Sequence, residues 1–336
     1  MSRISYILRC IAGMDYKAMF STVSSIQKKS GKSRVALFSD VVKCGLKYGC
    51  GYRDYELNEW WTLNAEQRKT YVTRGINNQI VAKMNDPEYY HLLDNKAEFL
   101  EKFSRFVKRK WINTETCTEE EFRTFLDGLD TVVIKPMAES CGRGVEKLSV
   151  GDFESPSALL EHIRSAGSTL CEECIVQNAA ISALYPHSVN TLRIVTVIGR
   201  DGMPHIVYAF IRIGNGGRVV DNINAGGMAA PIDLDSGIIK AVAFDKNSVY
   251  YEKHPETGAD IVGAQIPMWN RAKDMVLEAA ALIPQIGYVG WDVAVGENDV
   301  MLVEANQHPG HDFLQMPPHV PDKIGMLPRF REFFDI

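Results

Sequence analysis

Residues 288–311 read YVGWDVAVGENDVMLVEANQHPGH, and this stretch carries the clearest pattern in the chain. Two apolar runs, 293–295 and 300–303, flank a polar turn at 296–299. Apolar runs on either side of a short polar turn are typical of a β-hairpin. We therefore expect two neighbouring strands here, joined by the turn.

Three oxygen-bearing side chains belong to the two expected strands. Glu304 and Asn306 share one face of the second strand, because side chains alternate along a strand. With Asp292 on the first strand, they offer the oxygen ligands that a hard cation such as Mg²⁺ prefers when it carries phosphates. The other interpretation is an edge hairpin whose acidic residues only keep it soluble.

This metal site requires a particular strand register. Asp292 and Glu304 are twelve residues apart. A four-residue loop at 296–299 would therefore place Val303 opposite Asp292. The two carboxylates lie opposite each other only with a loop of odd length or a β-bulge, and we expect one of these.

Size and composition indicate an ordinary globular protein. The chain has 336 residues, of which 46% are hydrophobic and 24% charged, so it is long enough for two or three domains. The formal net charge of −5 and the pI of about 5.9 argue against a nucleic-acid partner, because such partners select a basic surface.

Cysteine usage and hydropathy both favour a cytoplasmic protein. Seven scattered cysteines, an odd number, favour free thiols in a reducing compartment. Cys171 and Cys174 form a lone C-x-x-C without the second pair that a zinc site needs, so we interpret them as packing residues. Arg9 interrupts the apolar segment 1–14, and nothing later reaches the roughly 18 apolar residues of a membrane span. We expect a soluble protein without a membrane span.

The first part of the chain has helical periodicity. Apolar residues recur at helical spacing from Ala18 to Ile26, Gly31 supplies a stop, and a second apolar face follows over 35–46. We predict a mainly helical N-terminal subdomain over 1–74. An aromatic cluster follows these helices, and we interpret it as contacts between helices rather than a ligand site. It consists of Tyr52, Tyr55, Trp60 and Trp61.

A lysine and a glycine-rich loop follow a later predicted strand. Residues 131–136 read TVVIKP, a short buried strand whose closing proline ends the ladder and leaves Lys135 at the strand end. In the loop at 138–145, small residues let backbone N–H groups approach an anion. They are Ser140, Gly142 and Gly144. Lysine beside such a loop favours phosphate binding, and the other interpretation is a glycine turn beside an exposed lysine.

Two other nucleotide-binding motifs are missing from the sequence. No G-x-x-x-x-G-K-[ST] occurs, and no G-x-G-x-x-G stands between a strand and a helix. A P-loop and a Rossmann dinucleotide site are therefore disfavoured.

Polar residues also occur in the next predicted strands. Residues 173–178 read ECIVQN, a strand running into a polar turn. Within 186–197, Arg193 faces the same way as Thr191, and an arginine inside a sheet is costly unless an anion pairs with it. Further residues could hold a carboxylate or a transferring phosphoryl group, or pair with local acids such as Asp221. They are Arg212, Arg218, Asn222, Gly226 and Gly227.

The order of these features resembles the ATP-grasp superfamily. It comprises a lysine before a helix, a strand lysine with its loop, an arginine strand, a glycine pair and a final D…E-x-N: Lys96, Lys135, Arg193, Gly226, Gly227, Asp292, Glu304 and Asn306. SVNTLRIVT, HPETG at 254–258 and EANQHPGHD are similar to the sugar-transfer-associated ATP-grasp family, which is associated with bacterial surface-polysaccharide assembly. The resemblance covers about residues 75–320.

The resemblance implies an α+β ATP-grasp fold, in which two lobes grip ATP, joined to the helical N-terminal subdomain. The small lobe, with the phosphate-binding lysine and loop, would span 75–180. The C-terminal lobe, with the metal and substrate site, would span 181–336.

The resemblance also implies roles for individual residues. Lys96 and Lys135 would contact the α- and β-phosphates of ATP, with the 138–145 loop closing over them. Adenine would face Val176, Gln177 and Asn178. One or two Mg²⁺ ions would be held by Asp292, Glu304 and Asn306. Substrate contacts would come from Asn190, Asn222, Gly226 and Gly227.

One departure from the family pattern concerns the catalytic arginine. D-alanine ligases carry an arginine just before the first metal aspartate, where this chain has Gly290 and Trp291. The missing charge would come from Arg193, Arg212 or Arg218, and the sequence does not choose among them.

The implied activity is an ATP-dependent carboxylate–amine ligase that forms an amide through an acyl phosphate and releases ADP and phosphate. No nucleophilic side chain is required, so we interpret Cys141 as a packing residue, while His308 and His311 are candidates for contact with the acceptor. The implied partners are small-molecule carboxylate and amine substrates, such as a sugar acid or an amino acid in cell-surface polysaccharide biosynthesis, and a homo-oligomer stays open. The alternatives are a small-molecule kinase on the same fold and a non-catalytic nucleotide-binding partner of a polysaccharide assembly complex.

Overall fold

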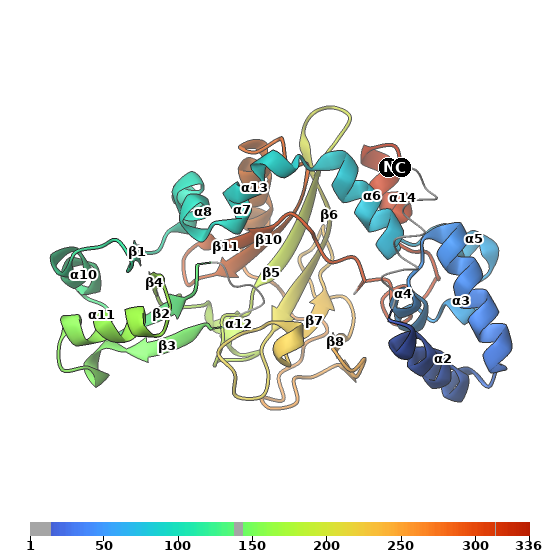
Figure 1. Cartoon of the computed structure of the whole chain (residues 1–336), viewed down its shortest axis with the longest axis horizontal. Coiled ribbons are helices and arrows are strands. Elements are labelled where there is room, and N and C mark those ends of the chain that lie inside the picture. Colours follow the sequence, from blue (N-terminus) through green and yellow to red (C-terminus); the bar gives the residue numbers. More distant parts are fainter. Residues whose placement is uncertain (1–14, 138–143, 313) are drawn as a thin grey trace. The chain divides into compact units, whose positions relative to one another are not determined.

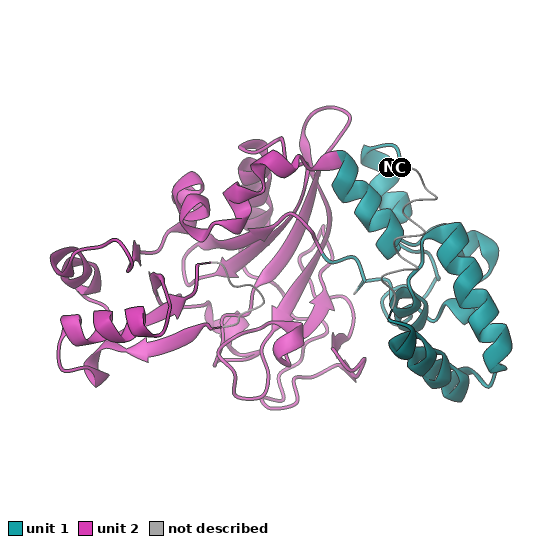
Figure 2. Ribbon diagram, in the orientation of Figure 1, with its two compact units in different colours: residues 1–83, 310–336 teal, residues 84–309 magenta. Residues whose placement is uncertain are grey.

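The computed structural model describes residues 15–137, 144–312 and 314–336. The chain divides into two compact units, which Figure 2 colours separately. Unit 1 comprises residues 1–83 and 310–336, and unit 2 comprises residues 84–309. Residues 310–336, which the sequence analysis assigned to the C-terminal lobe, belong to unit 1.

Unit 1 is helical, and its two long N-terminal helices begin and end at capping residues. The Asp15 side chain accepts the Ala18 N–H (2.9 Å) at the start of α2, and Gly31 ends that helix with a φ of 69°. Ser33 and Gly49 cap α3 in the same way. The bounds are α2 (Tyr16–Ser30), α3 (Arg34–Tyr48), α4 (Tyr52–Leu57), η1 (Trp60–Thr62), α5 (Ala65–Arg68), α6 (Arg74–Met84) and α14 (Leu327–Phe333).

The aromatic residues of unit 1 pack between these helices. Tyr55 and Trp60 are 1% and 0% exposed. The Trp60 ring makes edge contacts with Tyr48 and Tyr71, at centroid distances of 5.6 and 5.9 Å. The interpretation of the aromatic cluster as contacts between helices is confirmed.

In unit 2, a four-stranded antiparallel sheet carries the lysine strand, in the order β1-β4-β2-β3. Helices α10 and α11 pack on it, and their apolar side chains form a core with Val132 and Ile134. The bounds are β1 (Trp111–Asn113), β2 (Thr131–Lys135), β3 (Glu146–Ser149), β4 (Leu170–Glu173), α10 (Glu119–Leu126), α11 (Pro156–Ser165) and η3 (Val150–Asp152).

The position of β4 corrects one prediction. The strand expected over 173–178 is wrong, because β4 ends at Glu173, where that strand was to begin. Beyond it, Gln177 makes a single bridge to Gly296, and the apolar Val176 is 66% exposed. The sequence pattern did not predict a strand over 170–173, because Glu172 is charged although the strand is buried.

A seven-stranded antiparallel sheet forms the centre of unit 2, in the order β11-β10-β5-β6-β7-β8-β9 (Figure 1). Helix α13 packs against it, and its Val276 joins Ile194, Trp291 and Leu302 in one buried cluster. The strands are β5 (Leu192–Ile198), β6 (Pro204–Ile213), β7 (Met228–Pro231), β8 (Ala243–Asp245), β9 (Tyr250–Tyr251), β10 (Tyr288–Val295) and β11 (Val300–Asn306). The helices are η2 (Pro87–Tyr89), α7 (His91–Asp94), α8 (Lys96–Lys102), α9 (Ser104–Val107), α12 (Ala179–Ser182), η4 (Ile223–Ala225) and α13 (Trp269–Ala281).

The β10–β11 hairpin contains a β-bulge. Asp292 pairs with Glu304, and the register shifts before Val293, which leaves Val303 as the extra residue. Residues 296–299 connect the two strands, so the loop has an even length and the bulge restores the register. The prediction of an odd loop or a bulge is confirmed by the bulge.

The two cysteines of the C-x-x-C segment are not bonded to each other. Cys171 and Cys174 are both free thiols, and burial raises the pKa of Cys171 to about 12. No helix within the described ranges is long and apolar enough to cross a membrane.

Candidate functional site

Unit 2 contains a cavity lined by residues of both its sheets. Four cationic side chains line it: Lys96, Arg109, Lys135 and Arg212. Four carboxylates also line it: Glu172, Glu173, Asp221 and Glu304. A cavity with this density of cations suits a polyanionic ligand, provided that the carboxylates are themselves paired.

Lys135 lies at the end of β2 and forms an ion pair with Glu172 of β4. The Arg109 guanidinium donates to the other oxygen of Glu172, from Nη2 at 2.7 Å and from Nε at 3.2 Å. Burial alone would raise the pKa of Glu172, but the two cations lower it to about 2. Glu172 therefore stays ionised and fixes the direction of the Lys135 side chain.

Lys96 reaches the same part of the cavity from the first turn of α8. Its Nζ donates to the carbonyl oxygens of Pro136 (2.8 Å) and Met137 (3.0 Å), which directly follow Lys135. Asn95 caps α8 by accepting the Ala97 N–H at 3.0 Å. The structure therefore brings together the two lysines that were predicted to contact phosphates.

The predicted phosphate loop is described only at its end. Ser140, Cys141 and Gly142 lie outside the described residues. Gly144 has a φ of 67°, and a Cβ there would lie 2.7 Å from Cγ of Pro136. Position 144 therefore requires glycine for both its backbone conformation and its close approach to the lysine strand.

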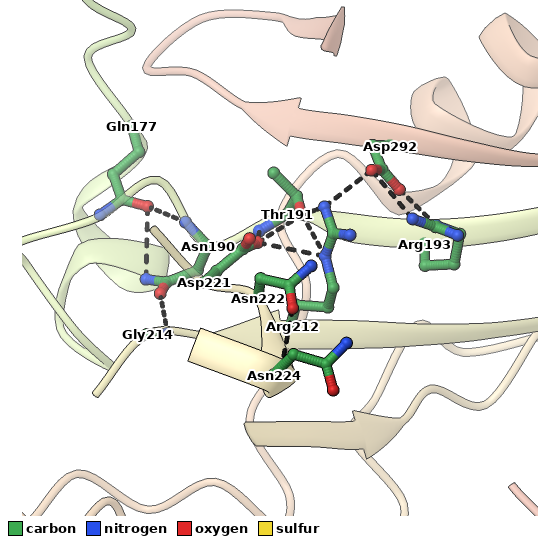
Figure 3. Close-up of polar contacts among 10 residues, drawn as sticks. All are labelled: Gln177, Asn190, Thr191, Arg193, Arg212, Gly214, Asp221, Asn222, Asn224 and Asp292. Atoms are coloured by element: carbon green, nitrogen blue, oxygen red, sulfur yellow. Dashed lines mark hydrogen bonds and ion pairs between the residues drawn. The ribbon is translucent and has the colours of Figure 1, made fainter. Parts of the chain in front are cut away.

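The predicted adenine-facing residues do not line the cavity. The Gln177 side chain donates to the Tyr185 and Ser188 carbonyls (3.1 and 2.8 Å) and accepts the Asn190 N–H (3.1 Å; Figure 3). Asn178 caps α12. Cys174 and Ile175, immediately upstream, line the cavity instead.

Asp292 holds two arginines. It lies opposite Arg193 in the β5–β10 pair and forms an ion pair with it, with Nη2 at 3.0 Å from Oδ2. Nη2 of Arg212 donates to Oδ2 of Asp292 at 2.7 Å and to Oγ1 of Thr191, also at 2.7 Å (Figure 3). Burial would raise the pKa of Asp292, but the two arginines lower it to about 2. The anion that pairs with Arg193 is therefore Asp292.

The three candidate catalytic arginines occupy different environments. Arg212 lines the cavity, and Oδ2 of Asp221 lies 3.4 Å from its Nε. Arg193 is 9% exposed. Arg218 is exposed and does not line the cavity.

Asp292, Glu304 and Asn306 form the candidate metal site. The bulge puts the carboxylate of Asp292 beside that of Glu304, and burial together with this neighbour raises the pKa of Glu304 to about 7. Nδ2 of Asn306 is buried without a hydrogen-bond partner. No three His, Cys, Asp or Glu side chains gather to hold a metal anywhere in the described ranges. The carboxylate oxygens of Asp292 and Glu304 and the amide oxygen of Asn306 nevertheless fit the oxygen-ligand preference of Mg²⁺.

Of the predicted substrate-binding residues, Asn222 lines the cavity. Asn190 is fully buried, donates to the Tyr185 carbonyl at 2.8 Å and accepts the Gly214 N–H at 3.0 Å, so it supports the fold. Gly227 allows close packing, because a Cβ there would lie 2.3 Å from the Asp221 carbonyl oxygen. Gly226, with a φ of 102°, directly precedes it.

The two histidines after β11 have partners of their own. The His308 ring makes an edge contact with Tyr90 at 5.6 Å. Nε2 of His311 lies 3.2 Å from Oδ1 of Asp54 within unit 1.

The sequence did not predict that Arg109 and Glu172 belong to the site. Each residue nevertheless has one unusual feature in the sequence. Arg109 belongs to a basic run, and Glu172 interrupts the C-x-x-C segment with a charge. Neither feature indicates that the residues meet, because 63 positions separate them.

A lysine-bearing sheet and a second antiparallel sheet line one cavity of unit 2, as the resemblance to ATP-grasp proteins implied. The sequence model of the sugar-transfer associated ATP-grasp family matches residues 75–331, which is more than half of the chain. The chain belongs to this family, as its sequence motifs implied.

Comparison with solved structures finds matches at low identity, with TM-scores below 0.5. The ATP-grasp ligase PsnB complexed with minimal precursor is 16% identical over 68% of this chain and 56% of its own, with a TM-score of 0.40. The D-alanine–D-alanine ligase from Bacillus anthracis is 13% identical over 77% of this chain and 73% of its own, with a TM-score of 0.43. In three PsnB structures, the chain spans 56%, 60% and 65% of the matched chain. Comparison with curated proteins finds no match.

Proposed function

We propose that this protein is an ATP-dependent carboxylate–amine ligase that uses Mg²⁺ and releases ADP and phosphate. The register of the β10–β11 hairpin carries the proposal. It puts Asp292 and Glu304 side by side, with Glu304 lining the same cavity as Lys135 and Arg212. Membership of the ATP-grasp family supports the nucleotide and the metal ion.

Each set of side chains has a task in this proposal. Lys96 and Lys135 bind phosphate oxygens, and Glu172 holds Lys135 in place. Mg²⁺ on Asp292, Glu304 and Asn306 would neutralise charge on the transferring phosphoryl group. Arg212 supplies a further fixed cation at the cavity wall, where no rearrangement is needed as charge develops.

The reaction needs no nucleophile from the protein. A carboxylate oxygen of the substrate bonds to the γ-phosphorus of ATP as the bond to the ADP oxygen breaks. The amine nitrogen then bonds to the acyl carbon, phosphate leaves, and the amine gives up a proton. The chain's part is to align the reactants and balance their charge.

The substrate class is a further part of the proposal. We propose a sugar acid or an amino acid as the carboxylate substrate, in the assembly of cell-surface polysaccharide. The association of the family with sugar transfer supports this choice.

The test is incubation of the protein with ATP, Mg²⁺, hydroxylamine and a panel of sugar acids and amino acids. A ligase forms a hydroxamate and ADP in equal amounts, because hydroxylamine captures the acyl phosphate. AMP and pyrophosphate as products would overturn the acyl-phosphate route. A stable phosphorylated product that forms without any amine would identify a kinase instead.

A further inference from the structure

An apolar surface lies along α2 and α3 of unit 1. No residue of the proposed active site belongs to these two helices. Six apolar side chains on it are between 36% and 80% exposed: Tyr16, Phe20, Val35, Phe38, Val42 and Leu46. The rings of Phe20 on α2 and Phe38 on α3 stack at 5.6 Å between centroids, with 7° between their planes. The exposed apolar surface therefore continues from one helix to the other.

Helix α3 is apolar on two sides. Its exposed apolar residues recur every three or four positions, so they form a stripe along one side. Its buried residues form a different side, which contributes to the core of unit 1: Leu37, Val41 and Cys44. An amphipathic helix needs one apolar side to pack in its own domain, so the second indicates a further contact.

The segment that contains α2 and α3, residues 15–53, has a formal charge opposite in sign to that of the whole chain. Residues 15–53 contain eight of the 37 Lys and Arg but two of the 42 Asp and Glu, which gives a formal charge of +6 in a chain of net charge −5. Of the two acids, Asp40 is ion-paired with Arg68 at 2.7 Å. The eight basic residues are all exposed: Lys17, Lys28, Lys29, Lys32, Arg34, Lys43, Lys47 and Arg53.

Lysines border the stripe. Lys43 follows Val42 by one position, which puts it about 100° further round α3. Lys47 stands in the same relation to Leu46, and Lys17 follows Tyr16 on α2. Long lysine side chains at the edge of an apolar stripe can extend their ammonium groups to the plane of the surface that it contacts.

We propose that the α2–α3 face docks the protein on the surface of an anionic lipid bilayer. The apolar stripe, with its aromatic rings, would enter the interfacial layer, and the bordering lysines would meet the headgroup phosphates. A second copy of this chain suits the face poorly, because two copies of a segment with a formal charge of +6 repel each other. This inference does not depend on the proposed enzymatic reaction.

The test is co-sedimentation of the full-length protein with vesicles. We expect binding to vesicles of phosphatidylcholine mixed with phosphatidylglycerol, little binding to phosphatidylcholine alone, and release at high salt. Equal binding to both vesicles, or none to either, overturns the proposal.

Two triple variants separate the apolar and electrostatic contributions. Val35→Ser with Val42→Ser and Leu46→Ser should weaken binding about tenfold or more, because the stripe no longer partitions into the interface. Lys17→Glu with Lys43→Glu and Lys47→Glu should weaken it on the order of 100-fold. Circular dichroism checks that both variants keep the helical content of the parent.

The matched controls alter exposed residues of unit 2. Lys102→Glu with Arg123→Glu and Lys240→Glu makes the same change in net charge, and Met203→Ser with Val249→Ser and Val262→Ser removes the same number of apolar side chains. Neither control should reduce vesicle binding, and a loss equal to that of the α2–α3 variants contradicts the proposal. Binding to soluble polyglutamate that equals vesicle binding would identify an acidic peptide as the partner instead. A change of solution mass in the α2–α3 variants, measured by light scattering, would identify a contact between copies.

Discussion

Asp292 lies directly opposite Glu304 although a four-residue segment connects their strands. The bulge at Val303 makes this possible, and the pKa values of the two carboxyl groups are shifted in opposite directions. Asp292 is ionised between two arginines, whereas the pKa of Glu304 is raised to about 7. Besides its place in the proposed metal site, Asp292 pairs with two arginines of the sheet, whereas Glu304 lines the cavity.

Glu304→Gln should reduce ADP formation on the order of 100-fold or more at saturating ATP, because the metal site loses a charged ligand. The fold should survive, since Glu304 lines the cavity. A coupled assay for ADP with increasing Mg²⁺ measures the effect. Glu297→Gln, on the exposed turn of the same hairpin, is the control and should behave like the parent. Normal activity in Glu304→Gln would remove this residue from the metal site.

Asp292→Asn should cost stability as well as activity. The substitution leaves the buried charges of Arg193 and Arg212 without their carboxylate, which lowers the free energy of unfolding by about 3–5 kcal/mol. Urea denaturation compares this variant with Glu304→Gln, which should unfold close to the parent. Equal stability of the two variants would contradict the division of roles between the carboxylates.

Arg212→Met should lower kcat strongly, whereas Arg218→Met should leave it within a few-fold of the parent. Arg212 lines the cavity and is held by Thr191 and Asp292, so its charge is fixed where phosphoryl transfer would occur. Arg218 is exposed outside the cavity lining. Steady-state kinetics on both variants decide between them, and the reverse order would assign the catalytic charge to Arg218.

The Glu172 contacts should stabilise the protein in a pH-dependent way. Because the folded pKa is about 2 and the ordinary value is 4.5, this contribution is present above pH 4.5 and is lost as the pH falls toward 2. Glu172→Gln should therefore be less stable than the parent near neutral pH, with the difference shrinking in acid. Urea midpoints between neutral and acidic pH measure the difference. Glu173→Gln is the neighbouring control, and a constant difference at every pH would contradict the assignment.

His311 should titrate above its ordinary pKa. Burial would lower the pKa of His311, but Asp54 raises it above 6.5. The pair stabilises unit 1 below pH 6.5, and this contribution is lost as the pH rises through the folded pKa. NMR titration of the His311 ring measures the pKa directly, and Asp54→Asn should lower it. A pKa at or below 6.5 in the parent would contradict the pairing.

Local patterns predicted the elements that rest on local physics. The lysine strand and the two apolar runs of the hairpin are set by alternation and by a proline. The role of Lys96 was implied by the resemblance to the ATP-grasp superfamily and not by a local pattern. Even the bulge followed from counting residues, because the two carboxylates could not otherwise share a face.

The sequence failed where a polar side chain has a distant partner. Gln177 looked like a ligand contact, but carbonyl groups of the following turn use its amide. Glu172 was not predicted as a site residue, and its buried carboxylate is paired with Arg109, 63 positions away. Such pairs depend on the folded arrangement of sheets, and no spacing rule reports them.

Arg109 couples the two sheets of unit 2. The same guanidinium that binds Glu172 donates from Nη1 to the Leu302 carbonyl of β11 at 2.6 Å. If the lysine sheet swung away from β11, a buried cation would lose a partner on one side. The distance between Lys135, at the end of β2, and the carboxylate of Glu304 is therefore set before any ligand binds. Little of the binding free energy is then needed to assemble the cavity.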